Sequence, residues 1–203
     1  MSIKRVLSAL IGALIFTPCV VTATPLYTTC VACHGAQGQG NAALNAPAIA
    51  SQEAWYVARQ LKNFKAGIRG THEKDLYGKQ MRPMSMTLPN DEAIKKVSEY
   101  IAALPAPPKE DLKGFGGDPK KGAGLYVTCT ACHGAKAEGK QALNAPKLAT
   151  LPSWYLVRQL QHFKAGVRGA HPKDTYGAQM RPMSMTLAND QAIKDVVAYI
   201  KSL

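Results

Sequence analysis

The feature that most constrains this chain is an internal duplication that carries the same cysteine motif twice. The phrase TCVACHG at 29–35 recurs as TCTACHG at 128–134, and a shift of 99 positions aligns the two halves without a gap. Two further blocks are repeated unchanged: LNAP at 44–47 and 143–146, and QMRPMSMTL at 80–88 and 179–187. A duplication of this kind indicates two domains of one fold rather than a solenoid of many small repeats.

We predict four segments from this duplication: a leader at 1–23, a first domain at 24–104, a linker at 105–117 and a second domain at 118–203. The linker reads PAPPKEDLKGFGG, and its prolines stiffen the first part while its glycines loosen the end. Each domain is so small that its core is thin, and we therefore expect a covalent staple or a cofactor in each.

The leader has the pattern of a cleaved secretory signal peptide. Lys4 and Arg5 precede a short apolar run at 6–16, and Ala23 ends a small-residue cleavage site. The run is too short for a comfortable membrane span, and an uncleaved anchor is the alternative. We expect a periplasmic protein that is exported by a cleaved signal peptide and is either free or membrane-associated.

The charge of the chain is positive and uneven. The formal net charge is +12, and removal of the leader leaves +10. Of this, +3 falls on the first domain and +7 on the second, whereas the linker is neutral. Such a charge attracts an acidic partner surface or an anionic membrane surface. Nucleic acid is not an expected partner, because the leader directs the chain out of the cytoplasm.

The sequence predicts an all-α fold, because strand signals are nearly absent. Apolar residues at helical spacing predict helices at 54–64 and 91–104 in the first domain and at the matching positions of the second. Asn90 is a candidate N-cap, and Asn189 is its counterpart. The apolar stripes of the two last helices are predicted to consist of Ile94, Val97, Ile101 and Leu104, and of Ile193, Val196, Ile200 and Leu203.

The two domains are expected to differ at their start. Asp118 and Pro119 have the pattern of a cap followed by proline at the first helical position, which opens a helix that ends at the cysteines. The first domain has a shorter helix there if cleavage follows Ala23. The segments 35–51 and 69–88 are rich in Gly, Pro and Asn and are predicted to be long loops, which in so small a unit need something to wrap around.

C-x-x-C-H is the attachment signal for c-type haem. Each thiol adds to one vinyl group of the porphyrin, and the histidine that follows then lies under the iron as an axial ligand. The motif predicts two covalently bound haem c groups, attached through Cys30 and Cys33 with His34 and through Cys129 and Cys132 with His133. The alternatives are a disulfide in each pair, a thioredoxin-like redox pair, for which the βαβ setting is missing, and a zinc site, for which each motif offers too few ligands.

The second axial ligand is predicted from the methionine-rich repeat. Met81 and Met180 each lie 47 residues after their proximal histidine, and a thioether ligand gives a high-potential centre that is closed to substrates. Each is followed by Arg-Pro, and we expect proline to keep this segment non-helical. His72 and His171 are the rival ligands. The remaining methionines of the block, Met84, Met86, Met183 and Met185, are predicted to fill the core.

Haem also carries two propionates, which need hydrogen-bond donors where they are buried. The candidates are Trp55, Arg59, Arg69, Trp154, Arg158 and Arg168, with helix packing or solvated surface as their alternative roles. His162 has Asn63 rather than a histidine as its counterpart, so we predict that it is a surface residue.

At this point the chain resembles the dihaem cytochromes c4, which are tandem class I c-type units. The resemblance rests on C-x-x-C-H early in each unit and on QMRPMSMTLPNDEAIKKVSEYIAAL at 80–104, which is similar to the axial-methionine loop and C-terminal helix of that family. It implies that Met81 and Met180, each seven residues before a leucine, are the ligands. The blocks of the form WYxxRQLxxFKAGxRG are also similar to cytochrome c segments fused to oxidase subunits.

The resemblance implies a periplasmic electron carrier whose partners are redox proteins, such as a terminal oxidase or a quinol-oxidising complex. Two six-coordinate irons leave no position for a substrate, so we expect outer-sphere electron transfer and not catalysis. The alternatives are a dihaem enzyme of the peroxidase or thiosulfate dehydrogenase type and a fixed subunit of an oxidase complex.

Overall fold

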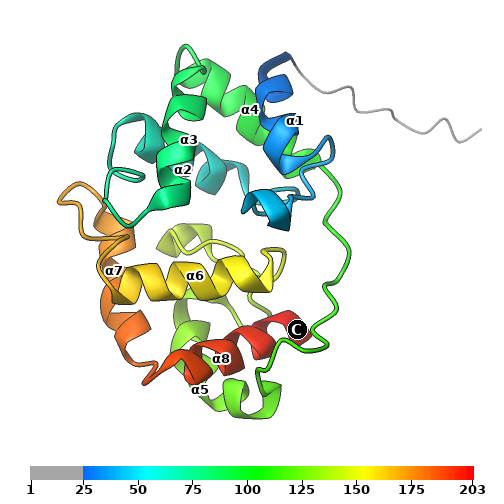
Figure 1. Cartoon of the computed structure of the whole chain (residues 1–203), viewed down its shortest axis with the longest axis vertical. Coiled ribbons are helices and arrows are strands. Elements are labelled where there is room, and N and C mark those ends of the chain that lie inside the picture. Colours follow the sequence, from blue (N-terminus) through cyan, green and yellow to red (C-terminus); the bar gives the residue numbers. More distant parts are fainter. Residues whose placement is uncertain (1–24) are drawn as a thin grey trace, which may run out of the picture.

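The computed structural model describes residues 25–203. The predicted signal peptide and its cleavage site lie outside these residues. The described chain forms two helical units, one above the other in Figure 1, and the linker runs down one side from the first to the second. No strand occurs in residues 25–203, and two isolated β-bridges, Asn41 with Ala46 and Lys140 with Ala145, close equivalent turns. The predicted all-α fold is confirmed.

The first unit contains four α-helices and two 3₁₀ turns within the described residues. They are η1 (Pro25–Tyr27), α1 (Thr28–His34), η2 (Ala42–Leu44), α2 (Ala54–Lys65), α3 (Leu76–Met86) and α4 (Asp91–Ala103). The second unit repeats this order with one turn fewer. Its elements are α5 (Pro119–His133), η3 (Gln141–Leu143), α6 (Ser153–Lys164), α7 (Thr175–Met185) and α8 (Asp190–Ser202).

The caps predicted from the sequence form as expected. The side chain of Asn90 accepts a hydrogen bond from the Ala93 amide at 2.9 Å, and Asn189 does the same at the start of α8. Asp118 accepts from the Lys120 amide at 2.9 Å, with proline at the first position of α5. Each cap satisfies an amide that the first turn of a helix leaves unpaired, typically worth about 1 kcal/mol.

One helix in each unit was not predicted. The segment 69–88 contains α3, which includes Met81 and continues through Pro83. Proline lacks the amide that would donate to the carbonyl four residues earlier, and the helix continues through Pro83 to Met86 without that bond. The side chain of Asp75 caps its first turn by accepting from the Gly78 amide at 3.0 Å. The expectation that proline keeps this segment non-helical was therefore wrong, and α7 repeats the same arrangement in the second unit.

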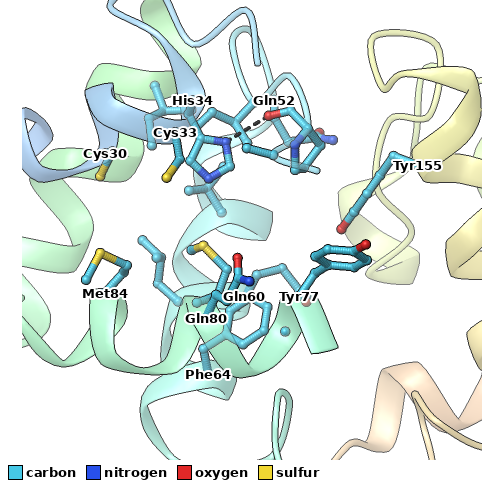
Figure 2. Close-up of a pocket in the computed structure, with 18 of the residues that line it drawn as sticks. Cys30, Cys33, His34, Gln52, Gln60, Phe64, Tyr77, Gln80, Met84 and Tyr155 are labelled. Atoms are coloured by element: carbon cyan, nitrogen blue, oxygen red, sulfur yellow. Dashed lines mark hydrogen bonds between the residues drawn. The ribbon is translucent and has the colours of Figure 1, made fainter. Parts of the chain in front are cut away.

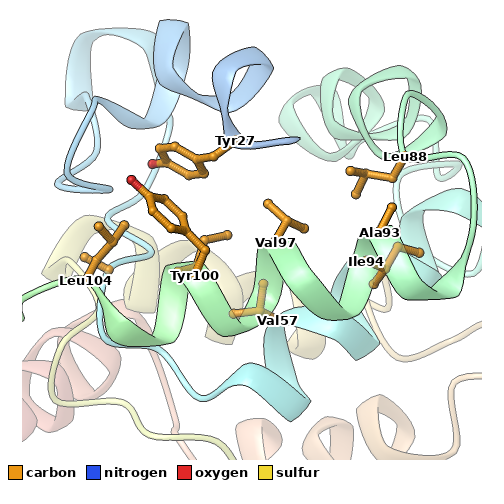
Figure 3. Packing of buried hydrophobic residues seen from close by; sticks show 10 residues of the cluster. Tyr27, Val57, Leu88, Ala93, Ile94, Val97, Tyr100 and Leu104 are labelled. Carbon is orange, nitrogen blue, oxygen red and sulfur yellow. The ribbon is translucent and has the colours of Figure 1, made fainter. Parts of the chain in front are cut away.

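The last helix of each unit supplies the centre of its core. Figure 3 shows α4 with Ile94, Val97 and Tyr100 directed toward Tyr27 and the neighbouring helices. Ile94, Val97 and Ile101 are at most 2% exposed, as their helical spacing predicts. In α8 the equivalent stripe is buried except for Leu203, which is 37% exposed because the helix ends at Ser202.

The units also differ at their first helices, as expected. α1 has seven residues and α5 has fifteen. The extra turns of α5 lie against α8, and Gly122 is required at their closest approach, because a Cβ there would lie 2.0 Å from the carbonyl oxygen of Asp195. The second unit is therefore closed by a helix pair that the described part of the first unit lacks.

The segment 105–117 has no helix and is fastened to the second unit. The Glu110 carboxylate accepts hydrogen bonds from the backbone amide and hydroxyl of Ser153 at 2.7 and 2.6 Å, which satisfies the start of α6. Phe115 packs against the second core. Among the described helices, none combines the length and apolar character needed to span a membrane.

Candidate haem sites

Each unit encloses a mostly apolar cavity between its cysteine motif and its methionine-bearing helix. The volumes are ≈180 Å³ in the first unit and ≈150 Å³ in the second. Each would hold on the order of ten water molecules, whereas native cores leave few voids larger than one. Cavities of this size in units of this size indicate that a large apolar group completes each core.

The proximal histidines are oriented by the chain itself. His34 ends α1 and is 6% exposed, and its Nδ1 lies 2.8 Å from the carbonyl oxygen of Pro47. A carbonyl only accepts, so Nδ1 carries the proton and Nε2 keeps a free lone pair. Figure 2 shows the His34 ring beside Cys33 among the side chains that line the cavity. His133 has the same 2.8 Å contact with Pro146.

The buried position keeps both imidazoles neutral. Burial lowers the pKa of His34 and of His133, and in each case the proline carbonyl offsets only part of that effect. A neutral imidazole with a fixed tautomer is the form that binds iron. The repeated LNAP block, which the sequence did not explain, therefore supplies the carbonyl that orients each histidine.

The four cysteines line the two cavities as free thiols, so the structure does not favour a disulfide in either pair. Cys30 and Cys129 are partly buried, whereas Cys33 and Cys132 are exposed. Burial raises the pKa of the Cys30 and Cys129 thiols, with a smaller effect from the neighbouring cysteine. This placement fits thioether bonds to a group that fills the cavity and reaches the surface at one edge.

Methionines form part of the wall across each cavity from the histidine. Met81 and Met84 line the first cavity, and Met180 and Met183 line the second. Figure 2 shows Met84 with Gln80 and Phe64 on the side opposite His34 and Cys33. The structure thus brings Met84 and Met183 to the cavities rather than into the helical core, whereas Met86 and Met185 are about half exposed.

The rival histidines take part in loop turns instead. His72 Nδ1 accepts a hydrogen bond from the Lys74 amide at 3.1 Å, and His171 Nδ1 accepts from the Lys173 amide at 3.1 Å. Neither is among the residues that line a cavity. The placement therefore brings methionines, and not these histidines, to the cavity walls.

The four arginines predicted as propionate donors all reach the cavities, and each cavity receives one from each unit. Arg69 and Arg158 line the first cavity, and Arg59 and Arg168 line the second. Arg69 Nε and Arg168 Nε are buried without a protein acceptor. Such donors are costly unless a group in the cavity accepts their hydrogen bonds, which the carboxylates of a haem would do.

The two tryptophans lie elsewhere. Trp55 and Trp154 are not among the cavity-lining residues. Each packs edge-on against the following tyrosine, at 5.8 and 5.9 Å between ring centroids, and each lies 4.9 Å from an arginine of its own helix, Arg59 or Arg158. On α2 and α6 the tryptophans therefore pack against these arginines and do not form part of the cavity wall.

The units meet through a reciprocal network of hydrogen bonds, here called the interface network. Arg69 donates to Tyr155 at 3.0 Å and Gln159 at 2.9 Å, and Arg168 donates to Tyr56 at 3.0 Å and Gln60 at 3.1 Å. Each arginine also donates to the glutamine of its own unit. The members are Tyr56, Gln60, Arg69, Tyr155, Gln159 and Arg168.

The interface network also forms the common wall of the two cavities. Both cavities are lined by Tyr56, Gln60, Tyr155 and Gln159, together with Leu151. These tyrosines and glutamines were not predicted as site residues from the sequence. The two copies share these residues within WYxxRQL, whereas many of their surface positions differ. This identity is the sequence pattern that points to them.

A second pair of contacts lies beside this network. Arg59 donates to the Oδ1 and carbonyl oxygen of Asn144 at 3.0 and 2.9 Å, and Arg158 donates to Oδ1 of Asn45. Both asparagines have positive φ, 55° and 56°, a conformation that asparagine tolerates better than most residues. The asparagine of LNAP therefore closes its own turn and binds the other unit.

We expect Tyr56→Phe to lower the free energy of unfolding by about 1–2 kcal/mol. The variant removes one of the three side-chain acceptors of the buried Arg168 guanidinium, the others being Gln60 and Gln159, and so costs a buried charged group one hydrogen bond. Urea unfolding of the holoprotein measures the change. Tyr199→Phe is the matched control, since Tyr199 lies on α8 with its ring against Tyr126 and away from the interface network. Equal stability of both variants would contradict the role given to the network.

Comparison with known proteins matches both units. The Cytochrome c family model matches residues 22–105 and again residues 119–203. The chain is 30% identical over 193 residues to the thiosulfate dehydrogenase electron acceptor of Stutzerimonas stutzeri (strain A1501), a match that covers 89% of this chain and 82% of that protein. It is 30% identical over 183 residues to cytochrome c4 of Azotobacter vinelandii, covering 86% and 84%.

A solved structure shows the same arrangement of units. Reduced recombinant cytochrome c4 from Pseudomonas stutzeri superimposes with a TM-score of 0.70 at 25% sequence identity. The match covers 87% of this chain and 94% of that chain, so it includes both units and their relative placement.

Proposed function

The chain belongs to the cytochrome c family, as its resemblance to the dihaem cytochromes c4 indicated, and from this premise we propose that it is a periplasmic carrier that passes electrons between two redox proteins. Its cofactors are two covalently bound haem c groups, attached through Cys30 and Cys33 and through Cys129 and Cys132. Each haem supplies one centre that gains or loses a single electron.

We assign the iron ligands as His34 with Met81 and His133 with Met180. The observation that carries this assignment is the pairing, in each cavity, of a histidine whose tautomer is fixed with a methionine wall. The chain holds both ligands on helices, so little must move when the charge of the centre changes. The lining of each cavity is mostly apolar, which limits the access of water to the group inside.

The interface network gives the two centres a common boundary. Tyr56, Gln60, Tyr155 and Gln159, together with Leu151, line both cavities and so form a shared wall between the two groups. The buried arginines fix these side chains, so the distance between the centres is set by the fold. This arrangement supports an electron entering at one unit and leaving from the other.

The surface around the second cysteine motif favours an acidic partner. The loop that follows the motif carries Lys136 and Lys140, whereas the equivalent positions of the first unit are Gln37 and Asn41. Both lysines are exposed, and Nζ of Lys140 donates to the carbonyl oxygen of Ala131, the residue before the exposed Cys132, at 3.0 Å. We therefore propose that the second unit docks on an acidic redox protein such as a terminal oxidase, by electrostatic steering.

The double variant Lys136→Gln and Lys140→Asn tests this docking, because it installs the residues of the first unit. We expect the bimolecular rate of oxidation by oxidase-containing membranes to fall roughly three- to tenfold at low salt and to lose most of its dependence on ionic strength. The matched control is Lys95→Gln and Lys96→Gln on α4. A control that slows the reaction equally would assign the effect to net charge, and a rate independent of salt in the unaltered protein would exclude steering.

The likeness to a thiosulfate dehydrogenase electron acceptor favours an enzyme of that kind as the electron donor. Mixing the oxidised holoprotein with a purified thiosulfate dehydrogenase and thiosulfate tests this directly. We expect both haems to be reduced only when all three components are present. Reduction by thiosulfate without the dehydrogenase would identify the chain as an enzyme in its own right and contradict the proposal.

A further inference from the structure

The two units differ at one partly buried position of their interface. His162 of α6 has Asn63 of α2 as its counterpart. The Nδ1 of His162 lies 3.8 Å from Oδ1 of Asp75 in the first unit, and the two side chains are 19% and 8% exposed. The prediction that His162 is a surface residue was therefore wrong, because α6 is covered by the first unit. By the 99-residue correspondence, Asn63 and Asp174 are the equivalents of His162 and Asp75, so the second site has an asparagine where the first has a titratable histidine.

Asp75 connects this position to the first haem site. Its carboxylate caps α3, the helix that carries Met81, and it lines the first cavity. It is held tightly, because a Cβ on Gly78 would lie 2.0 Å from its Oδ2. A fixed negative charge at the edge of the cavity stabilises the oxidised, more positive centre relative to the reduced one. Any group that neutralises this charge raises the reduction potential of the first centre.

We propose that His162 is a positioning residue that links proton uptake to reduction of the first centre, through Asp75, and that the second centre lacks this link. When the first centre accepts an electron from a redox partner, the His162 imidazole takes up a proton from solvent, and both are released on oxidation. The inference rests on the proposed function, since it requires a redox-active group in the first cavity.

The charges that face His162 determine the pH range in which this link operates. Burial lowers the pKa of His162, Asp75 opposes that effect, and the neighbouring Arg69, Arg158 and Arg168 lower the pKa further. The net direction is downward, so the ring is neutral at pH 7 and gains its proton below its ordinary value of about 6.5. The first midpoint potential should therefore rise as the pH falls through this range.

Spectroelectrochemical titration of the holoprotein between about pH 5 and pH 8 tests the proposal, with His162→Asn and Asn63→His as matched variants. In the unaltered protein we expect one midpoint potential to depend more steeply on pH than the other. His162→Asn should remove the difference, and Asn63→His should add a dependence to the other centre. A tenfold change in proton affinity between the two oxidation states corresponds to about 59 mV for one electron.

The readouts separate the link from a structural role and from the haem itself. Haem propionates titrate in both units, so the comparison between variants isolates the contribution of position 162. NMR titration of the ring should give a pKa of His162 that is higher in the reduced protein than in the oxidised one. Equal values, or equal pH slopes in the unaltered protein and His162→Asn, would overturn the proposal. If two reversible midpoint potentials were still observed in that case, the proposed electron-carrier function would be retained.

Discussion

Replacing Cys30 and Cys33 with alanine should yield a protein that carries one covalent haem and whose first unit is unfolded. The core of this unit is built around a cavity of ≈180 Å³. An unfilled cavity of that volume costs about 4 kcal/mol at 24 cal/mol per Å³, which is comparable with the whole stability of a small domain. Mass spectrometry counts the haem groups, and hydrogen exchange resolved by peptide reports folding of each unit.

The mirror variant, Cys129→Ala with Cys132→Ala, provides the matched control. It should keep the haem of the first unit and lose protection in the second, where α5 and α8 still pack on each other and preserve part of the fold. In both variants the remaining unit should lose some protection at the interface network, because its partners come from the unfolded half. Full protection of 25–104 without a covalent haem would contradict the cofactor's structural role.

The parts of the site that the sequence predicts are the parts that depend on local spacing. The cysteines and histidines follow from the C-x-x-C-H motif, and the buried stripe of α4 follows from helical periodicity. Both are short-range patterns whose physical requirement lies within a few residues. The arginines Arg69 and Arg168 were predicted to face the haem, and the structure places them at the cavities but also in the contact between units.

The parts that the sequence does not predict depend on contacts between units. His162 looks like a surface residue when its sequence is considered alone, and in the structure its side chain is only 19% exposed and lies beside Asp75 of the first unit. Likewise, Tyr56 is hydrogen-bonded to Arg168, which is 112 positions away, and Gln159 is hydrogen-bonded to Arg69, which is 90 positions away. The helix that contains Met81 was missed for a different reason, since Asp75 and the packing of α3 on α2 outweigh the cost of one proline.

Met81→His should lower the reduction potential of the first centre by roughly 0.2 V, about a quarter of the range that axial ligands span. Imidazole donates more strongly than thioether to the oxidised iron and therefore stabilises it. Met81 lies on α3 in the wall across from His34, so a histidine there keeps both axial positions filled by side chains of the chain. Potentiometric titration measures the shift, and the weak near-infrared absorption of methionine-bound iron should fall to about half.

Met84→His and Met86→His complete the experiment, because the three methionines differ in their relation to the cavity. Met84 lines the same cavity and is 40% exposed, whereas Met86 is 51% exposed and does not line it. We expect both variants to keep the near-infrared absorption of two methionine-bound centres and to leave both potentials close to those of the unaltered protein, since neither removes an axial ligand. The opposite result would be loss of half of the absorption in Met84→His and no loss in Met81→His. In that case the iron ligand is Met84, about one helical turn further along α3. By the same 99-residue correspondence, the ligand in the second unit would then be Met183 and not Met180.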